Sequence, residues 1–153
     1  MQWGRFDMPT EPTSGGTSNE PRELLNVTVP ATASAIAGVS DTVAGIMLDL
    51  GIPEEKRLEI GLALQEALAN AVVHGCGNDP SKNVHCRLNC DGEDRILIIV
   101  SDPGPGLDMS SLASPMVGEN LYQDHGRGIY LIRQLMDDVR FERGGSEIQM
   151  WKY

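Results

Sequence analysis

The stretch Leu64-Gln-Glu-Ala-Leu-Ala-Asn-Ala-Val-Val-His-Gly75 decides much of the fold and of the chemistry. Within it Glu66, Asn70 and His74 recur every four residues, so a helix places them on one face. Leucine and alanine crowd both sides of these positions, and the face therefore turns polar groups toward mostly apolar surroundings. Such groups require a ligand, a metal or a partner to satisfy them. An ordinary exposed polar stripe is the alternative interpretation.

The segments on either side of this helix predict an α+β domain. Apolar residues alternate in the strand segments and recur at three- and four-residue steps in the helix segments. The order strand, helix, helix, strand, strand, loop, helix, strand, strand predicts a two-layer sandwich with a mixed, mostly antiparallel sheet and helices on one face. The expected strands are Leu24–Val29, Asn83–Cys90, Arg95–Ser101, Val139–Arg143 and Glu147–Lys152, and the expected helices are Ala33–Leu50, Pro53 to about His74, and Gly126–Met136.

The chain of 153 residues is long enough for one hydrophobic core and predicts one domain. Residues 1–22 are rich in Pro, Ser, Thr and Gly and cannot bury enough surface to offset their ordering entropy, so we expect a flexible tail there. Residues 23–153 form the expected folded domain. Trp3 and Phe6 are exceptions in the tail, and they leave open that its tip docks on another surface.

The charge and the apolar pattern exclude several classes of partner. The formal net charge is −10 with only 12 Lys and Arg, which argues against nucleic acid because phosphate backbones are held by cations. No apolar run approaches the roughly 20 residues that span a bilayer. No secretory signal is recognisable at the start either, so we expect no membrane partner and a cytoplasmic location.

The three cysteines form neither an even set nor a closely spaced pair. We therefore expect Cys76, Cys86 and Cys90 to be buried, reduced thiols. Cys86 and Cys90 could share one face of a strand, but two thiols without a well-placed histidine make a weak metal site.

A second motif is Ile98-Ile-Val-Ser-Asp-Pro-Gly-Pro-Gly-Leu107. An apolar strand delivers Asp102 at its end, where a carboxylate can accept hydrogen bonds from an amino group inside a pocket. Gly104 and Gly106 would let a flat ligand approach the backbone. Many ordinary turns have this pattern, so the motif alone is weak.

A third motif is His125-Gly-Arg-Gly-Ile-Tyr-Leu-Ile-Arg133. Gly126 and Gly128 precede an apolar helix pattern, and glycines at a helix N-terminus expose N–H groups that suit phosphate oxygens. A plain capping turn explains this pattern equally well. The phosphate-binding GxxxxGK[ST] motif does not occur in the chain.

The three motifs in this order resemble the N, G1 and G2 boxes of the GHKL ATPases, which have the Bergerat ATP-binding fold. The phrases Glu-Ala-Leu-Ala-Asn-Ala-Val-Val-His and Gly-Arg-Gly-Ile-Tyr-Leu-Ile-Arg-Gln-Leu-Met-Asp most resemble the anti-sigma-factor serine-protein kinases of that superfamily. The resemblance covers about residues 24–152. It implies an ATP-binding protein kinase that uses Mg²⁺.

The resemblance also implies a role for each motif residue. Asp102 would bind the exocyclic amine of adenine, and Gly104 and Gly106 would shape the base pocket. Asn70 would coordinate Mg²⁺, and Glu66 would be the general base that activates the attacking hydroxyl.

The remaining roles concern the phosphates. Residues 107–125 would form a lid over the triphosphate, and the amides near Gly126–Gly128 would hold phosphate oxygens. Arg127 either contacts the phosphates or is a solvated residue at the helix start. His74 either contacts the phosphates or caps its own helix. His85 lies on a strand and is expected to have no special role.

By the same resemblance, the substrate would be a serine or threonine on a STAS-type anti-sigma-factor antagonist, a sigma factor would compete for binding, and the kinase would commonly be a homodimer. Some kinases of this kind carry a basic residue just ahead of the second glycine box, where this chain has Gln123-Asp124-His125, and this departure leaves the phosphate-binding cation open. The alternatives are a non-catalytic ATP-binding switch that sequesters a partner, a purely structural domain, and a detached domain of the histidine-kinase type.

Overall fold

The structure, a computed structural model, describes residues 20–93, 95–106 and 124–153, and of residues 124–127 only the backbone. Most of the expected tail and residues 107–123 of the expected lid lie outside these ranges. The division of the chain at residue 22 therefore stays a prediction. The helices and strands are β1 (Arg22–Pro30), α1 (Ala33–Asp49), α2 (Glu54–Asn70), a π-helical turn (Ala71–Gly75), β2 (Asn83–Cys90), β3 (Ile96–Ser101), α4 (Asp124–Leu135), β4 (Asp138–Glu142) and β5 (Glu147–Lys152).

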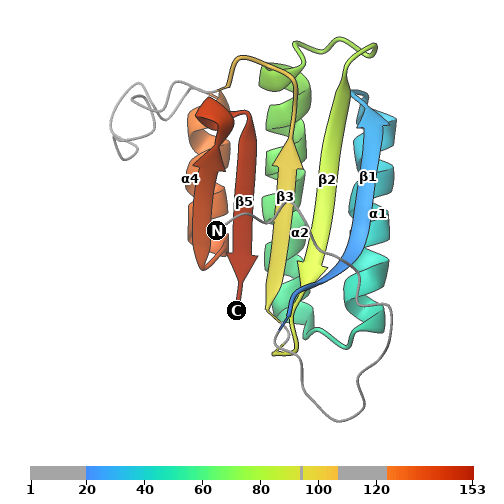
Figure 1. The fold of residues 1–153 in the computed structure, drawn as a ribbon. Helices are drawn as coiled ribbons and strands as arrows, with labels where there is room; N and C mark the ends of the chain where they lie inside the picture. Colours follow the sequence, from blue (N-terminus) through green and yellow to red (C-terminus); the bar gives the residue numbers. More distant parts are fainter. Residues whose placement is uncertain (1–19, 94, 107–123) are drawn as a thin grey trace.

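The five strands form one sheet in the order β1-β2-β3-β5-β4. Every pairing between these described strands is antiparallel, which confirms the expected antiparallel character and leaves no parallel pair among them. The last strand, β5, lies between β3 and β4. Figure 1 shows α1, α2 and α4 together behind the sheet, so the expected two-layer α+β sandwich is confirmed.

The main core lies between the helices and the sheet. Alternate side chains of β2, Val84, Cys86 and Leu88, are completely buried there, as the period-two pattern of a strand requires. From the helices, Leu64, Leu68 and Ile132 enter the same core. A smaller cluster of Leu97, Ile99 and Trp151 lies on the other face of the sheet.

The expectation of buried free thiols is confirmed, since all three cysteines are free and buried. Burial raises the pKa of the Cys86 thiol to about 12. Within the described residues, no helix combines the length and apolar character needed to cross a bilayer.

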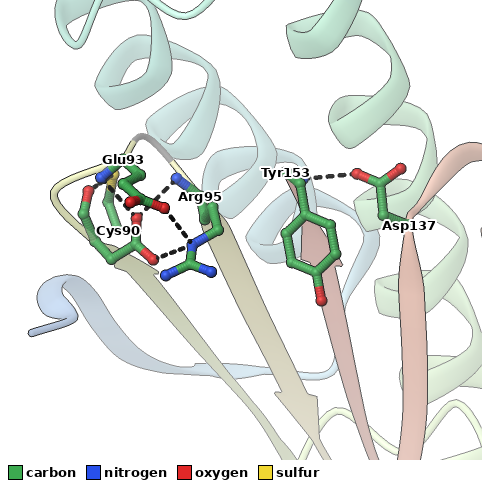
Figure 2. A network of polar contacts seen from close by, with 6 residues as sticks. Cys90, Glu93, Arg95, Asp137 and Tyr153 are labelled. Atoms are coloured by element: carbon green, nitrogen blue, oxygen red, sulfur yellow. Dashed lines mark hydrogen bonds and ion pairs between the residues drawn. The ribbon is translucent and has the colours of Figure 1, made fainter. Parts of the chain in front are cut away.

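One end of the sheet is closed by side-chain contacts to turn residues (Figure 2). The Asp91 carboxylate accepts hydrogen bonds from the backbone N–H groups of Glu93 and Arg95, at 2.9 and 3.1 Å, and from the Arg95 Nε at 2.5 Å. The backbone N–H of Tyr153 donates to Asp137 at 2.6 Å. These contacts hold the β2–β3 turn and the end of β5. The loop after β3 and the β4–β5 hairpin lie at the opposite end of the sheet.

Two helix boundaries differ from the expected ones by two residues or more. The second helix ends at Asn70 and continues as a wider π turn, in which the Cys76 N–H donates to the Ala71 carbonyl at 2.8 Å. The third helix begins at Asp124, two positions before the expected Gly126. Both differences fall beside the residues of the three motifs, and π turns of this kind are frequent at functional sites.

Candidate functional site

A pocket with about 420 Å³ of empty space, part of it open to solvent, lies between the helix layer and the loop end of the sheet. Its walls come from α2 and the π turn, the end of β3, α4 and the β4–β5 hairpin. The lining residues are Ala67, Asn70, Ala71, His74, Gly75, Val100, Asp102, Gly106, Ile129, Phe141, Gly145, Ser146 and Ile148.

Asp102 follows directly after β3 and places its carboxylate in this pocket. Its backbone N–H donates to the Ser146 carbonyl at 3.0 Å, and its Oδ1 accepts from the Gly104 N–H at 2.8 Å. Burial raises the pKa of the Asp102 carboxyl above its usual range, and the hydrogen bond from Gly104 opposes part of that rise. A half-buried carboxylate with spare acceptor capacity is suited to receive an amino group from a ligand.

Two glycines allow the loops around Asp102 to meet. A Cβ on Gly75 would lie 2.1 Å from the Asp102 Cγ, and a Cβ on Gly104 would lie 2.2 Å from the Gly75 carbonyl oxygen. No side chain fits at either position without displacing Asp102 or the backbone of the π turn. The two glycines therefore set the depth of the pocket beside the carboxylate.

A third close approach joins the loop after β3 to the β4–β5 hairpin. Gly106 has a φ of +86°, and a Cβ there would lie 2.1 Å from the Gly144 carbonyl oxygen. Both the left-handed backbone and the lack of space require glycine at this position. The hairpin is thereby held against the pocket, where Gly145 and Ser146 line it.

Glu66 and Asn70 lie together on α2, and α4 approaches them closely. A Cβ on Gly128 would lie 2.8 Å from the Glu66 Oε2 and 3.3 Å from the Asn70 Nδ2. Both side chains are half-buried. Asn70 lines the pocket, whereas Glu66 sits one helical turn away beside Gly128. The structure thus brings a carboxylate and an amide to one edge of the pocket.

The other residues of interest are placed less uniformly. His74 is half-buried in the π turn and lines the pocket. Gly126 and Arg127 fall among the first four residues of α4, whose N–H groups have no helical acceptor, and Gly128 follows them. The side chain of Arg127 lies outside what the structure describes. His85 does not line this pocket; it lies on β2, where it hydrogen-bonds to Asn26.

Sequence reasoning missed the contribution of the C-terminal hairpin. Phe141, Ser146 and Ile148 line the pocket from β4, from the turn and from β5. The Gly144–Gly145 pair was the available signal, but it also fits any tight hairpin. Ala67 and Ala71 were missed as well, although small residues next to Asn70 on the same helix leave space for a ligand.

The donor groups fit a nucleotide with a magnesium ion. An amide oxygen such as that of Asn70 is a hard ligand that Mg²⁺ accepts, and Mg²⁺ usually takes the rest of its shell from water and phosphate. No group of three or more His, Cys, Asp or Glu side chains that could hold a metal occurs in the described part of the chain. A site with one protein ligand and substrate phosphates needs no such group.

Comparison with known proteins decides the family. A family model described as a histidine kinase-like ATPase domain matches residues 29–152. This chain belongs to the histidine kinase-like ATPase domain family. The serine-protein kinase RsbW of Halalkalibacterium halodurans is 33% identical over 138 residues, which cover 86% of this chain and 83% of the relative. The serine-protein kinase RsbW of Bacillus subtilis is 28% identical over 138 residues, 86% of each chain. Within the histidine kinase-like ATPase domain family, the chain is therefore a member of the serine-protein kinase branch.

Solved structures agree with the fold of a histidine kinase-like ATPase domain. The crystal structure of RsbU and RsbW domains from Mycobacterium tuberculosis superposes with a TM-score of 0.59 at 19% identity, covering 87% of this chain and 31% of that one. The crystal structure of the SiaB–SiaC complex from Pseudomonas aeruginosa gives a TM-score of 0.59 at 11% identity, covering 86% and 89%. At these identities the likeness shows the shared fold, and it confirms the expected fold class.

Proposed function

We propose that this chain is an ATP-binding anti-sigma regulatory factor that phosphorylates a serine or threonine of a STAS-type anti-sigma-factor antagonist. The observation that carries the proposal is the pairing of Glu66 and Asn70 over Gly128, at one edge of a pocket that also holds the Asp102 carboxylate. From Glu66 to Gly75, which touches Asp102, the helix and the wider π turn that continues it rise by at most roughly 13 Å, since an α-helix rises 1.5 Å per residue. The two groups of residues are thus separated in the way that the two ends of a nucleotide require.

At the Asp102 end, the carboxylate would accept a hydrogen bond from the exocyclic amine of adenine. The half-buried position of Asp102 makes this contact selective. A base without an amino group at this place would leave the carboxylate buried and without a hydrogen-bond donor, which costs free energy. Gly75, Gly104 and Gly106 leave room for a flat ring next to the backbone.

At the other end, Asn70 would hold Mg²⁺. The ion, when bound, neutralises charge on the phosphate oxygens of ATP. The free N–H groups at the start of α4, near Gly126 and Arg127, would supply further donors for phosphate oxygens. His74 lines the same pocket and is the other candidate donor.

Glu66 would act as the general base. In the transfer, the γ-phosphoryl group passes from ATP to the hydroxyl oxygen of the protein substrate, ADP leaves, and the hydroxyl proton moves to the Glu66 carboxylate. General bases contribute about 10²- to 10⁴-fold in rate. A module that only binds ATP has no use for a carboxylate at this place.

The partners follow from relatives named as serine-protein kinases and from the anti-sigma-factor resemblance. A sigma factor as the competing partner and a homodimer as the assembly belong to the same proposal. The chain would meet such partners in the cytoplasm.

The first test is nucleotide binding. A ligand that binds only the folded state stabilises it by about 2.7 kcal/mol at a hundredfold excess over Kd, so ATP with Mg²⁺ should raise the melting temperature clearly. The absence of a shift at millimolar ATP would remove the nucleotide site.

The second test is transfer. The purified chain, its Glu66→Ala variant and a STAS-type protein are incubated with labelled ATP and Mg²⁺. We expect label on a serine or threonine of the STAS-type protein with the unmodified chain, and binding without transfer with Glu66→Ala. Nucleotide binding with no transfer by either chain would favour the non-catalytic switch, and equal transfer by both would remove Glu66 as the base.

A further inference from the structure

The face of the sheet opposite the helices carries an apolar cluster that the nucleotide site does not use. Leu97, Ile99 and Trp151 form this cluster on β3 and β5. Figure 1 shows α1, α2 and α4 on the other side of the sheet. Among the described residues, no helix or strand packs over the cluster.

The cluster is nevertheless shielded from solvent. Leu97 and Ile99 are each 3% exposed, and Trp151 is 8% exposed. Arg140 stacks on the Trp151 ring at 4.9 Å from its centroid and covers one edge of it. A single arginine does not explain the burial of Leu97 and Ile99.

A buried polar side chain on the same face also indicates that a further segment packs there. Asn89 lies directly opposite Leu97 in the β2–β3 register and is 1% exposed. Neither its Nδ2 nor its Oδ1 has a hydrogen-bond partner among the described residues. An unpaired buried amide is costly, and one donor and one acceptor side by side match the backbone N–H and C=O of an extended segment.

The chain itself supplies a segment at this place. In the sheet register Glu23 pairs with Asn89, which pairs with Leu97, which pairs with Trp151. The start of β1 therefore lies level with the cluster, across the strands of the sheet. Strands lie about 4.8 Å apart, so β5 is roughly 15 Å from β1. Residues 1–19 reach up to about 60 Å when extended.

The composition of residues 1–19 matches the cluster. This segment holds Trp3 and Phe6, one of the two tryptophans and one of the two phenylalanines in the chain. Aromatic side chains bury about 150–250 Å² each and pack favourably on other rings. They have no evident use in a solvated tail.

We propose that residues 1–19 fold back across the helix-free face of the sheet, with Trp3 or Phe6 packed on Leu97, Ile99 and Trp151 and backbone groups of the segment paired with the Asn89 amide. A second copy of the chain is the weaker occupant. A stable interface needs about 800 Å² per partner, whereas the cluster has three side chains and is flanked by the charged Glu23, Arg87 and Arg140.

The experiment uses tryptophan fluorescence of the full chain. In Trp151→Phe the cluster keeps a ring, and Trp3 is the sole tryptophan. We expect Trp3 to emit at a shorter wavelength than in the denatured chain and to be quenched several-fold less by acrylamide, at all protein concentrations. Emission and quenching equal to those of the denatured chain overturn the proposal, and shielding that grows with protein concentration assigns the face to a second copy instead.

Two further variants keep the result interpretable. Ile99→Thr in the Trp151→Phe background keeps a β-branched strand former but removes apolar surface, and it should expose Trp3. Leu48→Thr, which changes an exposed side chain on α1, is the control and should not. In Trp3→Ala/Phe6→Ala, Trp151 is the sole tryptophan and should become several-fold more accessible to acrylamide. Unchanged shielding in Ile99→Thr and in Trp3→Ala/Phe6→Ala shows that the segment does not cover the cluster.

Discussion

Replacing Gly128 by alanine should separate catalysis from stability. The new Cβ would lie 2.8 Å from the Glu66 Oε2, and the atom it meets is the far end of a flexible side chain. We therefore expect the Glu66 carboxylate to move and the backbone of α4 to stay. Gly128 lies inside α4, where alanine is favoured over glycine by about 1 kcal/mol.

The gain in helix propensity and the strain on the Glu66 side chain have opposite effects on stability and nearly cancel. Forcing Glu66 away from its preferred rotamer costs about 0.5–1.5 kcal/mol, so the free energy of unfolding should change by less than about 1 kcal/mol. The chemistry is more sensitive, because a displacement of about 1 Å at a reacting group costs on the order of 100-fold in rate. We expect a loss of phosphoryl transfer of that size, equivalent to about 2.7 kcal/mol of activation free energy.

The assay compares urea denaturation with single-turnover phosphorylation of the STAS-type substrate protein. Gly45→Ala is the matched control, since it lies within α1 and its Cβ meets nothing within 4 Å. It should gain about the same helix propensity and keep full transfer. If Gly128→Ala transfers phosphate at the wild-type rate, the proposed role of Glu66 as the base is refuted. If it loses several kcal/mol of stability, the expectation that only the Glu66 side chain moves is refuted.

Three other substitutions test the rest of the pocket. Asp102→Asn should weaken ATP binding measured by calorimetry. Because burial raises the pKa of Asp102 above 3.8, the native state holds this proton more tightly than the unfolded state, so the free energy of unfolding of the parent chain falls as the pH rises from 3.8 through the raised pKa. Asp102→Asn should not show that decrease. If the free energies of unfolding of the parent chain and of Asp102→Asn change in parallel with pH, the raised pKa of Asp102 is contradicted. Asn70→Ala should abolish the Mg²⁺-dependent part of the thermal shift with ATP, and a retained dependence places the metal elsewhere. Gly106→Ala should cost about 2 kcal/mol or more in urea denaturation, whereas Gly77→Ala, at a φ of +59° with nothing within 4 Å, should cost only about 1 kcal/mol; equal losses refute the close contact with Gly144.

Much of the fold could be predicted because the local signals agree with one another. The three helices and five strands of the part that the structure describes follow from apolar periodicity and from the Pro and Gly residues that bound them. The order of the strands in the sheet could not be predicted in this way. Nothing in the sequence of β5 says that it inserts between β3 and β4, because that position depends on contacts between distant segments.

The site was predicted to the extent that its residues lie in short motifs. Asn70, His74, Asp102 and Gly106 line one pocket, and Glu66 lies beside it. The hairpin wall was missed because Ser146 and Ile148 contribute through position and not through an unusual residue type. The π turn was missed because it depends on Gly75 packing against Asp102 and Gly104, a contact invisible in local periodicity.

The insertion of β5 between β3 and β4 has a consequence for the order of events during synthesis. Until residues 147–152 have left the ribosome, β4 has no neighbour in the sheet, and the Ser146 carbonyl has not met the Asp102 N–H. Pairing of β3 with β5 joins residues about fifty positions apart, and such contacts form late and slowly. A nascent chain would therefore carry Glu66 and Asp102 long before the pocket beside them is complete, and the nucleotide site proposed above would form only once β5 has joined the sheet.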